Sequence, residues 1–130
     1  MELCEHPYRL PPQSAPTTQP ITNIPIKPLA QRLIRLCGFN FWLANRYAGC
    51  QRPTHRNAAE AIVAFCDTIG YENQKELCLP RALYAAKTSQ HFKEHGVIFI
   101  GVFLPSRAMH AWVIESGQLA DPYDSEWLHH

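Results

Sequence analysis

The period of the hydrophobic residues changes once along this 130-residue chain, at Gly96. Apolar residues recur at helical spacing before that point. After it, VIFIGVFLP (97–105) is a continuous apolar run rich in β-branched and aromatic residues, which predicts a strand buried on both faces. HAWVIES (110–116) and residues 118–123 predict two more strands, joined by a turn at Gly117. Helices followed by a small antiparallel sheet make an α+β fold.

Three helices are predicted ahead of the strands. The first spans 28–49, with Pro28 in its first turn, where proline is tolerated. Its buried stripe is expected to be Leu29, Leu33, Leu36, Asn40, Leu43 and Tyr47. The second spans 57–69, because Asn57 and Glu60 have the spacing of a capping box and Gly70 follows. The third runs from Cys78 to about His95.

Proline is concentrated at the start of the chain, where the first 28 residues hold seven of the eleven. That composition disfavours a helix or a central strand, so we expect 1–28 to be an extended or mobile tail and 29–130 to be the folded domain. No segment reads as a secretion signal or as a membrane span of about 20 apolar residues, so we expect a cytoplasmic protein. Five cysteines without a CxxC pair are expected to be free thiols.

Charge is unevenly distributed, although the net charge is only +1. Residues 6–59 contain seven Lys or Arg and no Asp or Glu. Such a surface suits an acidic protein, a membrane face or nucleic acid, and it is equally typical of a solvated basic face. Within it one helical stripe combines basic and aromatic side chains and is a candidate partner-binding surface: Arg32, Arg35, Phe39, Trp42 and Arg46. Alternatively, Phe39 and Trp42 pack under the proline-rich segment.

The stretch KELCLPRAL (75–83) places a cysteine at the start of a helix. Proline inside a helix costs about 3 kcal/mol or more, so Pro80 must lie in the first turn and Cys78 at the N-terminus. Unpaired N–H groups and the helix dipole favour a thiolate there. Cys78 is therefore a candidate nucleophile. A buried structural cysteine is the alternative interpretation.

A histidine and a carboxylate follow at suitable places. His110 opens the second predicted strand, and Asp121 lies across the hairpin turn from it, with Asp124 as the reserve candidate. Nucleophile, base and orienting acid are the three members of a cysteine-protease triad. Gln74, four residues before Cys78, is a weaker candidate for an oxyanion-stabilising amide. The His91 and His95 pair lacks further ligands at a recognised spacing, so no metal is expected.

The segments CLPRALYAAKTSQHFKEHG, VIFIGV and HAWVIESGQLAD resemble the transglutaminase-like leader peptidases of lasso-peptide biosynthesis, the microcin-processing protease family. The similarity covers roughly residues 77–121. It implies a papain-like or transglutaminase-like core in which Cys78 is the nucleophile, His110 the base and Asp121 the orienting carboxylate. Residues 29–70 are similar to the helical lead-in of the stand-alone form of these peptidases.

The resemblance also implies partners: the leader of a precursor peptide, a separate leader-binding recognition protein and the lasso cyclase. It implies neither a cofactor nor nucleic acid. Two other functions stay open at this point. One is acyl transfer to an amine, as in true transglutaminases, and the other is a non-catalytic adaptor that binds an acidic partner through the basic helix.

Overall fold

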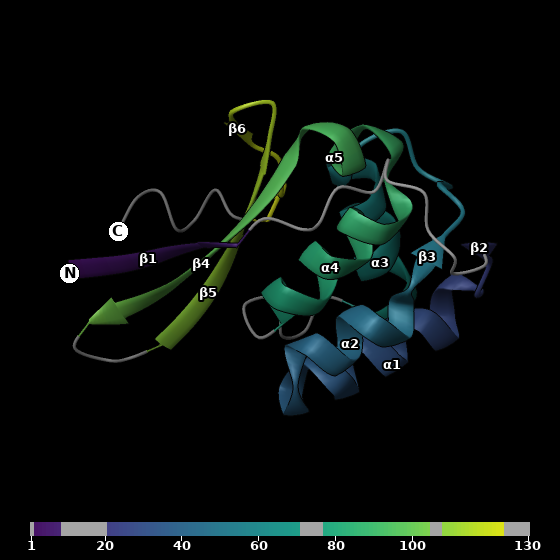
Figure 1. Cartoon of the computed structure of the whole chain (residues 1–130), viewed down its shortest axis with the longest axis horizontal. Coiled ribbons are helices and arrows are strands. Elements are labelled where there is room, and N and C mark those ends of the chain that lie inside the picture. Colours follow the sequence, from purple (N-terminus) through teal and green to yellow (C-terminus); the bar gives the residue numbers. More distant parts are fainter. Residues whose placement is uncertain (1, 9–20, 71–76, 105–107, 124–130) are drawn as a thin grey trace.

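The computed structural model describes residues 2–8, 21–70, 77–104 and 108–123. Within them the chain forms helices on one side and a sheet on the other (Figure 1). The helices are α1 (Ile26–Phe39), α2 (Phe41–Ala48), α3 (Ala58–Ile69), α4 (Cys78–Thr88) and α5 (Gln90–His95). The strands are β1 (Glu2–Tyr8), β2 (Ile21–Thr22), β3 (Cys50–Gln51), β4 (Gly96–Leu104), β5 (Ala108–Glu115) and β6 (Gln118–Leu119). The α+β prediction is confirmed.

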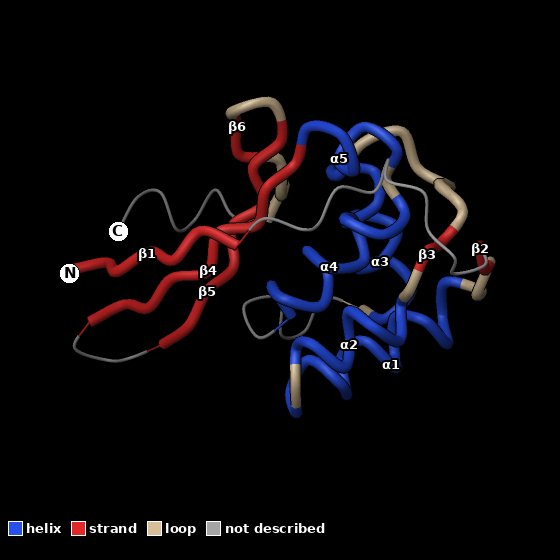
Figure 2. The backbone as a smooth tube through the Cα atoms, viewed as in Figure 1, coloured by secondary structure: helices blue, strands red, loops and turns tan. Residues whose placement is uncertain are grey.

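The main sheet has the strand order β1-β4-β5-β6, and each neighbouring pair is antiparallel (Figure 2). The β4–β5 register sets Gly101 opposite His110. Ser116 and Gly117 connect β5 to β6, and both have positive φ, of 51° and 78°. Two consecutive positive φ angles are what the tight type I′ hairpin turn requires, so the predicted turn at Gly117 is confirmed.

Helix α4 is the centre of the domain and packs against α1, α3 and β5. All but one of its residues are buried, and the small side chains Ala82, Ala85 and Ala86 are fully so. Small residues let a helix approach its neighbours closely. The core therefore forms around the helix that begins with the candidate nucleophile.

The predicted helix over 28–49 is in fact two helices. Asn40 has extended backbone angles, φ −161° and ψ 113°, and its side chain accepts hydrogen bonds from the backbone N–H groups of Trp42 and Leu43. Asparagine competes with the helix by bonding nearby backbone in this way, and it caps the next helix instead. The predicted buried stripe is consequently wrong after the break, since Asn40, Leu43 and Tyr47 are exposed.

The third predicted helix is divided for the same reason. Ser89 is extended, and its hydroxyl accepts a hydrogen bond from the N–H of Phe92, so that Ser89 caps α5, which begins at Gln90. The helix over 57–69 is confirmed as α3, with Asn57 accepting from the N–H of Glu60 and with Gly70 following at φ 91°.

The first 28 residues contribute to both layers where they are described. Glu2–Tyr8 forms β1, which pairs with β4 from Glu2↔Leu104 to Tyr8↔Ile98. It is an edge strand, where a proline such as Pro7 is tolerated. Helix α1 starts at Ile26, so Pro28 does lie in its first turn. Across the described part of the chain, none of the helices has the length and apolar content needed to cross a bilayer.

Candidate active site

Cys78 is the first residue of α4, as predicted, and Pro80 lies in the first turn. Leu77 precedes the helix and provides no side-chain cap. The first N–H groups of a helix have no partner within it and carry partial positive charge, which favours a thiolate. The residue is 6% exposed, so its sulfur lies almost entirely inside the protein.

The Cys78 sulfur contacts strand β5. The backbone N–H of Ala111 donates to Sγ over 3.4 Å, in a contact that is buried. Ala111 directly follows His110, so the sulfur lies at the backbone of the residue next to the candidate base. A helix N-terminus is thus joined to the strand that carries the histidine, although 32 residues separate the two side chains in sequence.

His110 is 1% exposed and lies edge-on to Trp112, with ring centroids 4.5 Å apart and an interplanar angle of 88°. Residues two apart on a strand share a face, so both rings lie on one face of β5 and Ala111 and Val113 on the other. The edge-to-face arrangement is a favourable one for aromatic rings and fixes the orientation of the imidazole. Trp112 therefore forms a wall beside the candidate base.

Asp121 comes to this region through the β5–β6 hairpin. The N–H of Ala120 donates to the carbonyl of Val113 over 2.9 Å, which continues the register of the Ile114↔Leu119 pair. Asp121 directly follows Ala120 and so lies at the end of this hairpin. Asp121 is buried. The hairpin thus returns the chain along β5, the strand that carries His110, before it reaches Asp121.

The carboxylate of Asp121 is held by a residue that sequence reasoning missed. Arg81 donates from Nε to Oδ2 of Asp121 over 2.5 Å, and both side chains are buried. The second oxygen, Oδ1, accepts from the backbone N–H of Tyr123 over 2.9 Å. The guanidinium also lies over the Tyr123 ring, with Cζ 5.7 Å from the centroid. Both carboxylate oxygens are therefore oriented by neighbouring groups.

Arg81 and Cys78 are three residues apart on α4, and side chains at that spacing lie on the same side of a helix. One turn of helix thus contacts the sheet twice, through the sulfur at Ala111 and through the guanidinium at Asp121. The signal for Arg81 was present in the sequence as the only charged residue between Cys78 and Lys87. A charge in an alanine-rich helix that must be buried needs a partner.

Other thiols differ from Cys78 in their surroundings. Burial, with a smaller contribution from the neighbouring Cys78, raises the pKa of Cys37 to about 12. Burial raises the pKa of Cys66 to about 11, with Arg81 acting in the opposite direction. Cys37, Cys50, Cys66 and Cys78 are all free, so the prediction of free thiols is confirmed for the cysteines with described side chains.

The other predicted site residues lie elsewhere. Gln74 and Asp124 are outside the described residues. The five members of the basic and aromatic stripe are all exposed, with Phe39 at 80% and Trp42 at 62%. These exposures give no support to the alternative in which the two rings pack under the proline-rich segment, of which residues 9–20 lie outside the described residues. Because the helix breaks at Asn40, the stripe belongs to two helices.

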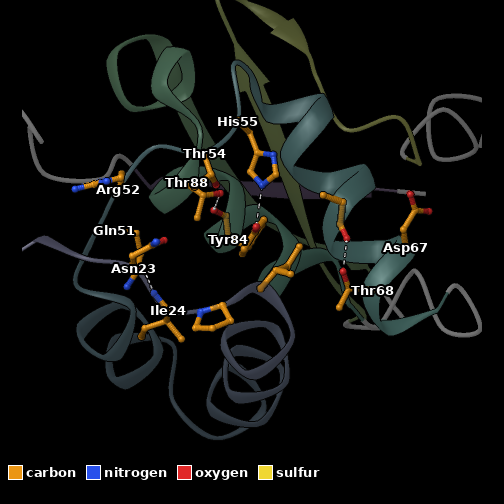
Figure 3. A pocket seen from close by; sticks show the side chains of 13 residues that line it. Asn23, Ile24, Gln51, Arg52, Thr54, His55, Asp67, Thr68, Tyr84 and Thr88 are labelled. Carbon is orange, nitrogen blue, oxygen red and sulfur yellow. Dashed lines mark hydrogen bonds between the residues drawn. The ribbon is translucent and has the colours of Figure 1, made fainter.

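A pocket of about 550 Å³ is lined by residues other than Cys78, His110 and Asp121 (Figure 3). Its walls come from residues 23–26, from the loop after β3, and from α3 and α4. His55 Nε2 lies 2.8 Å from the Tyr84 hydroxyl inside it. Burial lowers the pKa of His55, against the opposing charge of Glu60, and raises that of Tyr84. Both groups are thus neutral at pH 7, and sequence reasoning had not connected them.

Comparison of the chain with protein-family models, with curated proteins and with solved structures finds no match.

Proposed function

We propose that this chain is a cysteine peptidase that removes the leader from a ribosomally made, lasso-type precursor peptide. The observation that carries the proposal is the hydrogen bond from the Ala111 N–H to Cys78 Sγ. It sets a sulfur at a helix start against the backbone next to a buried histidine. A helix N-terminus and an adjacent base are two of the features that activate cysteine nucleophiles.

In the proposed reaction the Cys78 sulfur attacks the carbonyl carbon of the scissile peptide bond. The carbon–nitrogen bond then breaks, and the imidazolium of His110 gives its proton to the leaving amine. The product is a thioester between the leader and Cys78. Water attacks this thioester while His110 removes its proton, which releases the leader as a carboxylate and restores the sulfur. Asp121 orients the imidazole and stabilises its charged form.

The lasso-type substrate is supported by the similarity of residues 77–121 to that peptidase family, and the same similarity supports a transglutaminase-like core. The α+β arrangement agrees with such a core, in which the nucleophile helix packs on the strand of the histidine. A separate protein that binds the leader is part of the same proposal, as is the lasso cyclase that receives the cleaved peptide.

The test combines the chain with a lasso-type precursor peptide and a leader-binding protein, and detects the free leader by mass spectrometry. Cys78→Ala is expected to abolish release, whereas Cys50→Ala, on a different element, is expected to retain it. Added hydroxylamine should convert part of the leader to a hydroxamate, because it intercepts the thioester. A product formed mainly with an added primary amine in place of water would establish the acyl-transferase alternative. Absence of both products would overturn the enzymatic proposal and favour the adaptor.

A further inference from the structure

The hairpin of α1 and α2 has an exposed apolar end. Phe39 is the last residue of α1 and Trp42 the second residue of α2, and the two are 80% and 62% exposed. We call this pair the aromatic tip. Figures 1 and 2 show the α1–α2 junction at the lower end of the molecule, at the end of the helix pair opposite β2 and β3. Large exposed apolar groups gathered at one point of a surface mark an interaction site.

Arginines lie behind the aromatic tip. Arg35 is four residues before Phe39 and Arg46 four residues after Trp42, about 6 Å along each helix axis at 1.5 Å per residue. Arg32 is about 10 Å from the end of α1 by the same measure. All three are exposed, and the Arg32 guanidinium lies 5.5 Å from the centroid of the Tyr47 ring, so the two helices meet at this level. We call Arg32, Arg35 and Arg46 the arginine belt.

From this layering we propose that the α1–α2 hairpin binds an anionic lipid surface, with the aromatic tip inserted and the arginine belt at the level of the lipid phosphates. Interfacial helices bury their apolar groups about 5–10 Å into the boundary between headgroups and acyl chains. The spacing between tip and belt equals that depth. Aromatic rings are favoured at this boundary, and arginine binds phosphate strongly.

The absence of acidic residues on the hairpin supports a negatively charged lipid surface as its binding partner. Neither α1 nor α2 contains an Asp or Glu, and none occurs from residue 6 to residue 59. The whole chain has a net charge of only +1, so attraction to anionic lipid must come from this local surface and not from overall charge. An acidic protein partner matches the charge equally well. Binding to such a partner does not explain why the aromatic and basic groups lie at two separate levels along the hairpin.

The test is cosedimentation of the full chain with vesicles of phosphatidylcholine, either alone or mixed with phosphatidylglycerol. Binding is expected only to the mixed vesicles, and it should weaken as salt rises because exposed charges are screened over about 8 Å at physiological ionic strength. Arg35→Glu with Arg46→Glu should reduce the affinity by more than about 20-fold, since each basic residue contributes about fivefold at such a surface. Phe39→Ser with Trp42→Ser should lose vesicle binding at every salt concentration.

Matched controls change the same chemistry outside the aromatic tip and the arginine belt. Lys27→Glu with Arg52→Glu alters the net charge equally, at two exposed residues away from the tip. Val63→Ser removes an exposed apolar side chain of α3. Both controls should bind mixed vesicles more tightly than the corresponding hairpin variants, with unchanged melting temperatures in all. Equal binding to both vesicle types, or equal loss in the controls, would overturn the proposal. So would a chain that ignores vesicles but self-associates through the aromatic tip, which would make the hairpin a protein interface.

Discussion

Arg81 and Asp121 form a buried ion pair that joins the helix of the candidate nucleophile to the end of the β5–β6 hairpin. Nε and Oδ2 are 2.5 Å apart, and the side chains of both residues are at most 1% exposed. A buried carboxylate is costly unless it is paired and hydrogen-bonded. Arg81 supplies that pairing and leaves lone pairs of both carboxylate oxygens for other donors, since a carboxylate accepts about four hydrogen bonds.

Removing one partner of this pair is expected to destabilise the fold strongly. Arg81→Met should lower the free energy of unfolding by about 3–5 kcal/mol, because it leaves an uncompensated buried charge. Arg81→Met combined with Asp121→Leu should recover a large part of that loss, because neither charge then stays buried. Urea unfolding of the two variants and the wild type measures the difference. Equal destabilisation by the single and double changes would contradict a coupled pair.

Catalytic importance is expected to follow a definite order. His110→Ala should abolish leader release, because it removes the group that moves the proton. Asp121→Asn should leave a reduced rate, since nucleophile and base are both retained. Asp124→Asn serves as the control for the alternative carboxylate. Rates are compared under conditions in which each variant is folded, as checked by its melting curve. Were Asp124→Asn damaging and Asp121→Asn harmless, Asp124 would be the orienting acid.

Cys78 is expected to be the cysteine that alkylates first. Limiting iodoacetamide at neutral pH reacts with thiolates, and the pKa values of about 12 for Cys37 and about 11 for Cys66 keep those two thiols protonated. Peptide mapping after a short reaction should find the adduct mainly on Cys78, despite its 6% exposure. His110→Ala should slow that reaction if the imidazole assists the sulfur. Preferential modification of Cys4 or Cys50 would contradict the assignment.

Local signals predicted much of the fold. Asn57 and Gly70 mark the ends of α3 because each acts on the backbone next to it, and Pro80 fixes the start of α4 sterically. The breaks at Asn40 and Ser89 were missed for a related reason. Both residues continue the helical period in sequence, but their side chains bond the backbone N–H groups that follow. Periodicity alone does not reveal whether these N–H groups bond a backbone carbonyl within a continuous helix or the Asn or Ser side chain.

Long-range contacts were less predictable. Strand β1 pairs with β4 across about a hundred residues of sequence, and its composition gives no sign of a partner. The three candidate triad residues were identified because helix-start, strand-start and turn positions are locally encoded. Arg81 was not identified from the sequence, since an arginine in the first turns of a helix normally points to solvent. Only the position of the returning hairpin shows that Asp121 is its partner.

Gly96 is expected to be intolerant of a side chain. A Cβ added there would overlap the ring of Phe92, which is buried in the core. Gly96→Ala should therefore destabilise the fold by about 1–3 kcal/mol, as overpacking does. Gly38→Ala is the matched control, because a Cβ there meets nothing within 4 Å and the residue lies in α1. The control should be neutral or stabilising by up to about 1 kcal/mol in urea unfolding.

His55 should make stability depend on pH in the mildly acidic range. Burial lowers its pKa in the folded protein, whereas the unfolded chain binds the proton near the ordinary value of 6.5. The unfolded state thus binds more protons as the pH falls through 6.5, so this contribution to stability is present above that pH and is lost below it. His55→Gln keeps a side-chain acceptor for the Tyr84 hydroxyl without a titrating group, and should flatten the fall in melting temperature. His95→Gln, at an exposed imidazole, should retain the wild-type slope. A His55→Gln curve parallel to that of the wild type would show that other groups control the acid sensitivity.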